Sequence, residues 1–128
     1  MGYPHYRLPK PAAIILSYPV ITMGGLTHSG SADNLLGKKR TPELVQQTSV
    51  EKQVWAEFPP TFVWANRHDD TVDSRNSQML VDSLEQVSVP YKLMLFEGIT
   101  HGSGLATGTE AEGWFTEAAR FWEMHMDV

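Results

Sequence analysis

Three short apolar runs, two of them separated by a helix pattern, constrain the fold of this chain most strongly. The runs cover residues 12–18, 61–65 and 91–96 and are rich in β-branched, large aliphatic and aromatic side chains. Runs of this length next to proline or glycine are typical of buried strands. We therefore expect three strands, and we expect the first of them to be buried on both faces.

A helix pattern separates the second run from the third. Ser74 stands where an N-cap is expected, and Pro90 prevents the helix from continuing. Between them, apolar side chains recur at intervals of three and four residues: Met79, Leu80, Leu84 and Val87. A strand, a helix and a strand joined in this order favour a right-handed parallel connection. The predicted fold class is therefore α/β, a three-layer arrangement of a parallel sheet with flanking helices.

Two further helices are expected outside this unit. Thr41, Pro42 and Glu43 supply the N-cap, the first-position proline and the early acid of a short helix. A last helix is expected over residues 112–125. Its predicted inner face carries Trp114, Phe115, Ala118 and Trp122.

The length of 128 residues is that of a single domain with one core. Residues 22–58 are long for a simple connection between two strands. Sheets of this kind usually have about five or six strands. The chain therefore looks like part of a larger fold.

Composition excludes several classes of function. The formal net charge is -5 and the basic residues are scattered apart from 38–40, which argues against a nucleic-acid partner. No apolar run is long enough to span a membrane, and the absence of cysteine excludes disulfides and thiol nucleophiles. The histidines and acids lack the spacing of metal ligands, so we expect no metal and no cofactor. Residues 1–5 carry no secretion signal, so localisation stays open with the cytoplasm favoured.

Two loops carry the chemistry that the sequence suggests. In a parallel sheet, the loops that leave the carboxyl ends of neighbouring strands gather at one edge. Residues 66–72 follow the second strand and residues 97–104 follow the third. We therefore expect Asp70 to orient His101, so that the imidazole can act as a general base. Two simpler interpretations stay open: the acids cap the next helix, and His101 is a surface residue.

The sequence shows no nucleophile to complete such a pair. A serine in this kind of fold needs small residues two positions before and two after it, because its strand-to-helix turn is sharp. Neither Ser17 nor Ser103 has that context. A stretch that could form an oxyanion hole is also absent from the sequence.

Several blocks together resemble the C-terminal half of α/β-hydrolase esterases, closest to the acetyl-esterase and xylan-esterase-like group. The resemblance extends over residues 11–122. The blocks that carry it are residues 12–22, 28–31, 34–37, 59–64, 69–70, 76–77 and 101–106.

This resemblance implies a serine-type hydrolase of short-chain acyl or carbohydrate esters. It makes Asp70 the acid and His101 the base of a Ser-Asp-His triad, in the chain order of this fold. It also makes residues 22–58 an insertion over the pocket. The side chains of His28, Ser29 and Asn34 would there touch a small ester substrate. The nucleophile would come from a complementing N-terminal segment or another chain.

Two alternatives to this interpretation remain. The chain could be a non-catalytic remnant that serves as an interaction module and forms a homodimer through the exposed edge of its first strand. It could also fold poorly alone, because missing neighbours leave apolar faces in water.

Overall fold

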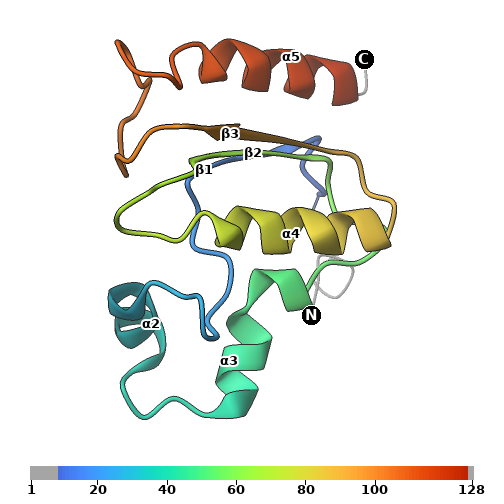
Figure 1. The fold of residues 1–128 in the computed structure, drawn as a ribbon. Coiled ribbons are helices and arrows are strands. Elements are labelled where there is room, and N and C mark those ends of the chain that lie inside the picture. Colours follow the sequence, from blue (N-terminus) through green and yellow to red (C-terminus); the bar gives the residue numbers. More distant parts are fainter. Residues whose placement is uncertain (1–8, 127–128) are drawn as a thin grey trace.

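A sheet of three parallel strands lies between layers of helices (Figure 1). The computed structural model describes residues 9–126, so residues 1–5, which carry no predicted secretion signal, lie outside the described residues. The strands are β1 (Ile14–Ser17), β2 (Thr61–Asn66) and β3 (Tyr91–Phe96), in the order β1-β2-β3. The predicted α/β class is confirmed, since both strand pairs are parallel.

The helices cover the two faces of the sheet unequally. They are α2 (Ser29–Leu36), α3 (Pro42–Thr48), α4 (Arg75–Gln86) and α5 (Trp114–His125), with a short 3-10 helix η1 (Val50–Lys52). Helix α4 packs beneath the sheet, with α2 and α3 beyond it, and α5 covers the opposite face (Figure 1). The helix predicted at Thr41 is confirmed, because the Thr41 hydroxyl accepts a hydrogen bond from the Leu44 N–H.

β2 is the central strand, and all its residues are buried. Phe62 and Trp64 pack towards α5, while Val63 packs towards α4 with Leu80 and Leu84. This alternation follows from the two-residue period of a strand. Both faces and both edges of β2 are therefore covered by other parts of the chain.

β1 differs from the prediction that both of its faces are buried. Ile15 lies opposite Phe62 in the sheet, yet 43% of its surface is exposed. Within residues 9–126, β1 is paired with β2 on one edge only. The prediction was wrong because a short apolar run does not reveal whether a neighbouring strand and helix are present to cover it.

The predicted inner face of α5 is also partly wrong. Trp114, Ala118 and Phe121 are the buried residues of this helix. Phe115 and Trp122 are instead 60% and 43% exposed. Residues at positions i, i+4 and i+7 share one face of a helix, and Phe115 lies about 100° away from that face. The sequence could not distinguish the two faces, because aromatic residues occupy both.

Ser74 occupies the predicted N-cap position of α4 without capping it through its side chain. Its backbone already has a helical conformation, and its hydroxyl donates to the Arg67 carbonyl oxygen. The carboxylate of Asp73 instead accepts the hydrogen bond from the backbone N–H of Arg75 at the start of the helix, and it also accepts one from the Arg75 side chain. These bonds, chiefly the side-chain one, hold the pKa of Asp73 below its ordinary value.

Replacing one buried and one exposed apolar residue tests this assignment of faces. Leu84→Ala should lower the free energy of unfolding by about 2–5 kcal/mol, because it opens a cavity between α4 and the sheet. Phe115→Ala should change it by less than about 0.5 kcal/mol. Urea unfolding of the two variants measures both values. A comparable loss for Phe115→Ala would contradict the orientation of α5.

Candidate active site

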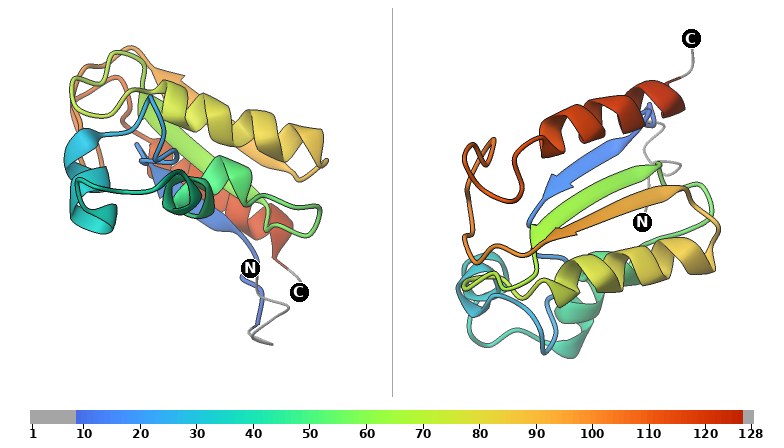
Figure 2. Two further views of the ribbon diagram at one scale, coloured as in Figure 1. Left: turned by 90° about the horizontal axis from the view of Figure 1, so that it is seen from below. Right: turned by 45° about the horizontal axis from the view of Figure 1, so that its top comes forward.

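The loops that follow β2 and β3 leave the sheet at the same end (Figure 2). Backbone hydrogen bonds continue the strand pairing into these loops. The Arg67 N–H donates to the Phe96 carbonyl oxygen, and the His68 N–H donates to that of Gly98. The Asp70 N–H then donates to the Ile99 carbonyl oxygen at 3.1 Å. The two loops are therefore held side by side, as the parallel arrangement predicts.

This pairing brings Asp69 against His101. The Asp69 Oδ2 lies 2.8 Å from the His101 Nδ1. The side chain of Asp69 is 1% exposed and that of His101 is 28% exposed. The other carboxylate oxygen of Asp69 accepts hydrogen bonds from the backbone N–H groups of Thr71 and Val72. A buried carboxylate at Nδ1 favours the imidazole tautomer whose Nε2 can accept a proton.

The predicted pairing of Asp70 with His101 is therefore corrected to Asp69. Asp70 is exposed, and its carboxylate accepts a hydrogen bond from the Thr71 hydroxyl at 2.9 Å. Its backbone N–H is engaged with Ile99, whereas the turn after Asp69 draws that carboxylate inward. An aspartate that bonds the N–H two residues on forms an Asx turn. The prediction of Asp70 was wrong because the two acids are adjacent in sequence, and only this local turn determines which carboxylate faces His101.

Asn66 is a site residue that the sequence reasoning missed. It is buried at the end of β2, and its Nδ2 donates to the Thr100 carbonyl oxygen at 2.8 Å. Thr100 directly precedes His101, so Asn66 fixes the backbone that carries the imidazole. Gly98 permits this approach, since a Cβ there would lie 2.8 Å from the Asn66 Oδ1. A polar residue directly after the four apolar residues 62–65 was the available signal.

The three predicted pocket residues all belong to α2 or its cap. α2 lies at the end of the molecule where the strands terminate (Figures 1 and 2). Ser29 and Asn34 are exposed. The His28 Nδ1 caps the helix by accepting a hydrogen bond from the Ser31 N–H. Within residues 9–126, no hydrogen bond joins these three residues to the Asp69–His101 pair.

The two serines considered as nucleophiles are not arranged for that role. The Ser17 hydroxyl accepts a hydrogen bond from the Trp64 indole N–H at 2.8 Å. Ser103 has a buried hydroxyl without a partner in the described part of the chain. No hydrogen bond within residues 9–126 joins either hydroxyl to His101.

Charged groups beside the pair are engaged with one another. The Arg67 guanidinium and then the His68 ring hold the pKa of Glu97 below its ordinary value. His68 lies 3.0 Å from Glu97, so it does not contribute to the Asp69–His101 pair. Among residues 9–126, no cluster of three or more metal-ligating side chains is present. Within the same range, we find no helix long and apolar enough to cross a membrane.

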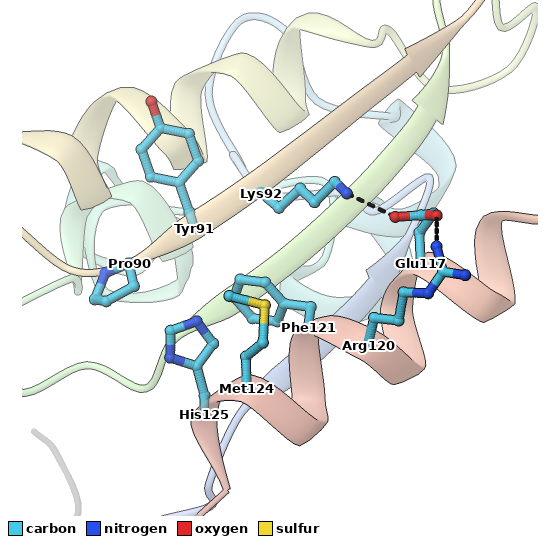
Figure 3. A pocket seen from close by; sticks show the side chains of 8 residues that line it. All are labelled: Pro90, Tyr91, Lys92, Glu117, Arg120, Phe121, Met124 and His125. Atoms are coloured by element: carbon cyan, nitrogen blue, oxygen red, sulfur yellow. Dashed lines mark hydrogen bonds and ion pairs between the residues drawn. The ribbon is translucent and has the colours of Figure 1, made fainter.

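A groove between β3 and α5 lies apart from this site (Figure 3). It is lined by Pro90 and Tyr91 at the amino end of β3, so it opens at the end of the sheet opposite His101. Lys92 bonds Glu117 across it at 2.9 Å, and this bond holds the pKa of Glu117 below its ordinary value. The groove therefore takes no part in the acid–base pair.

A sheet of parallel strands with helices on both of its faces corresponds to the C-terminal part of an α/β-hydrolase esterase fold. An acetyl ester-xyloside bifunctional hydrolase from Caldicellulosiruptor lactoaceticus has the same arrangement over 89% of this chain and 42% of its own, at 34% identity and a TM-score of 0.86. A carboxylesterase from Lactobacillus plantarum matches 95% of this chain and 49% of its own, at 25% identity and a TM-score of 0.73. The predicted resemblance is confirmed.

A curated protein is also similar to this chain in sequence. Endo-1,4-beta-xylanase B from Butyrivibrio fibrisolvens is 37% identical over 105 residues, which are 82% of this chain and 16% of the xylanase. The chain thus spans less than half the length of the two solved structures and a small part of this relative. No protein-family model matches the chain.

Exchanging each aspartate separately tests which one holds the imidazole. Asp69→Asn should change the 15N chemical shifts of the His101 ring, because the amide cannot stabilise the same tautomer. Asp70→Asn should leave these shifts unchanged, since within residues 9–126 the Asp70 side chain bonds the Thr71 hydroxyl and not His101. Heteronuclear NMR of the two variants makes the comparison. The opposite result would restore Asp70 as the partner.

The contact between Gly98 and Asn66 gives a second test. Gly98→Ala should destabilise the chain by about 1–3 kcal/mol, because the new methyl group displaces a buried and hydrogen-bonded amide. Gly25→Ala is the matched control, since its Cβ would meet no atom within 4 Å. Thermal unfolding monitored by circular dichroism compares the two, and equal stabilities would refute the close approach.

Proposed function

We propose that this chain supplies the acid and the base of a serine carboxylic-ester hydrolase. The hydrogen bond between Asp69 and His101 carries the proposal, because it leaves the imidazole Nε2 to exchange a proton with a reacting group. In this proposal the nucleophilic serine and the oxyanion donors come from a segment outside this chain. Similarity to two solved esterases over less than half of their lengths supports it.

The proposed mechanism uses each group in turn. His101 removes the proton from the serine hydroxyl as the serine oxygen attacks the ester carbonyl. The imidazolium then donates this proton to the leaving alcohol. Asp69 stabilises the imidazolium during both steps. Water afterwards attacks the acyl-enzyme with His101 again acting as the base, which releases the acid and restores the serine.

The open edge of β1 is where the missing segment would join. Its backbone groups are unpaired on one side within residues 9–126, and Ile15 is exposed beside them. Unpaired strand edges readily accept another strand. The same edge also supports the second candidate, a non-catalytic module that dimerises with another copy of itself.

The substrate class we propose is a short-chain acyl ester, including acetyl esters of carbohydrates. The solved relative with the higher identity acts on an acetyl ester and a xyloside, according to its description. We further propose that α2 borders the pocket, since it lies at the carboxyl end of the sheet. Ser29 and Asn34 are better placed to meet substrate than His28, whose Nδ1 is engaged as a helix cap.

A hybrid enzyme tests this proposal. Residues 9–126 would replace the matching part of the Caldicellulosiruptor hydrolase, which leaves that enzyme's own remaining segment in place. Hydrolysis of 4-nitrophenyl acetate is the assay. We expect the hybrid to be active, and we expect His101→Ala to lower its kcat by about 10³-fold or more. Asp70→Asn is the matched control for Asp69→Asn, and only the Asp69 variant should lose activity.

The unmodified chain provides the second arm. It should show no turnover above that of its His101→Ala variant, because it lacks the proposed nucleophile. Near-UV circular dichroism checks that each protein is folded. Full activity of a folded hybrid that carries His101→Ala would refute the catalytic assignment. A stable dimer of the chain, together with a folded but inactive hybrid, would favour the dimerising module.

A further inference from the structure

Tyr18, which directly follows β1, has a backbone conformation that side chains rarely adopt. Its φ is 40°, in the left-handed region where residues other than glycine and asparagine are strained. Its N–H still donates to the Trp64 carbonyl oxygen at 2.7 Å, so the residue remains attached to the sheet. Such strain persists only where surrounding contacts hold the residue in place.

The contacts that hold Tyr18 on one side come from the aromatic core. Its ring meets Trp64 edge to face, with centroids 5.1 Å apart and planes at 81°. Trp64 is fully buried and stacks on Trp114 at 5.2 Å. The Trp64 indole is also fixed by its hydrogen bond to the Ser17 hydroxyl. On this side, the position of the Tyr18 ring is thus set by the fully buried Trp64 of β2.

On its other side, Tyr18 contacts His101. The two ring centroids are 4.6 Å apart and the planes meet at 63°. The loop beyond His101 is attached to the same core, because the Trp114 indole N–H donates to the Gly104 carbonyl oxygen at 2.8 Å. A continuous series of ring contacts therefore joins Trp114, Trp64, Tyr18 and His101.

We propose that Tyr18 is a positioning residue that fixes the plane of the His101 imidazole. The inference rests on the proposed function, in which the Nε2 of this ring exchanges the proton. A hydrogen bond from Nδ1 to Asp69 leaves the ring able to turn about that bond. Contact with the Tyr18 ring removes this freedom and directs Nε2 towards one place. Misplacement of about 1 Å can cost about 100-fold in rate.

The hydroxyl of Tyr18 is dispensable in this role. Within residues 9–126 it makes no hydrogen bond, so the ring itself provides the contact. Tyr18→Phe should therefore preserve the positioning of the His101 imidazole, whereas Tyr18→Leu should remove it. Tyr91→Leu is the matched control, because Tyr91 begins β3 at the opposite end of the sheet. It removes a tyrosine ring that does not contact His101.

NMR of the full chain provides the first test. Aromatic ring currents from Tyr18 act on the carbon-bound protons of the His101 imidazole. Tyr18→Leu should remove this contribution and the nuclear Overhauser contacts between the two rings, while Tyr18→Phe and Tyr91→Leu should retain the His101 shifts. Unchanged His101 shifts in Tyr18→Leu would overturn the proposal, whether or not the chain takes part in catalysis.

Kinetics of the hybrid enzyme provide the second test. Tyr18→Leu should lower kcat by about 10- to 100-fold while KM stays within about threefold, because the base is misplaced and substrate binding is not. Tyr18→Phe should retain kcat within about threefold. A Tyr18→Leu hybrid with wild-type kcat would refute the positioning role. An inactive parent hybrid with intact His101–Tyr18 contacts by NMR would instead count against the proposed function alone.

Discussion

The parallel pairing of β2 with β3, continued by backbone hydrogen bonds into the loops beyond, is the constraint on which the rest of the structure depends. The register that aligns Asn66 with Phe96 determines which loop residues meet. Asp69, three residues after Asn66, forms a hydrogen bond with His101. Asn66 itself donates to the carbonyl oxygen of Thr100. A shift of one residue would turn the side chains of one strand to the opposite face and separate the pair.

Burial gives the pair its chemical character. A carboxylate that loses contact with water is costly unless hydrogen bonds replace its hydration. Asp69 has three such bonds, from Thr71, Val72 and His101. Two of them come from its own turn, so the acid is fixed independently of the histidine. His101 is then the more exposed partner, which is the arrangement that a proton-transferring group requires.

Much of this arrangement could be predicted from sequence, because it depends on local periodicity. Strand and cap patterns predicted β3 and helix α3, which begins at Pro42. The two loops that carry Asp69 and His101 were predicted because loops after neighbouring parallel strands gather at one edge of the sheet. The choice between Asp69 and Asp70 could not be predicted from spacing alone, since it depends on a turn that draws one carboxylate inward. The exposure of Phe115 depends on which tertiary neighbours are present, and no local pattern records them.

The incomplete sheet explains why one half of the proposed site can be ordered without the other. β2 has a strand on each edge, α4 on one face and α5 on the other, so the scaffold of both loops lies within this chain. Exposed apolar side chains occur both inside and outside these loops. Ile99 and Leu105 lie in the loop that follows β3, and each is 62% exposed. Phe115 and Trp122 lie on one flank of α5, and Ile15 lies on the open strand β1. Leaving such surface in water costs about 25 cal/mol per Å². At Ile15 this cost falls on the open strand β1, while the Asp69–His101 hydrogen bond and the backbone bonds between the two loops are made by residues that follow β2 and β3.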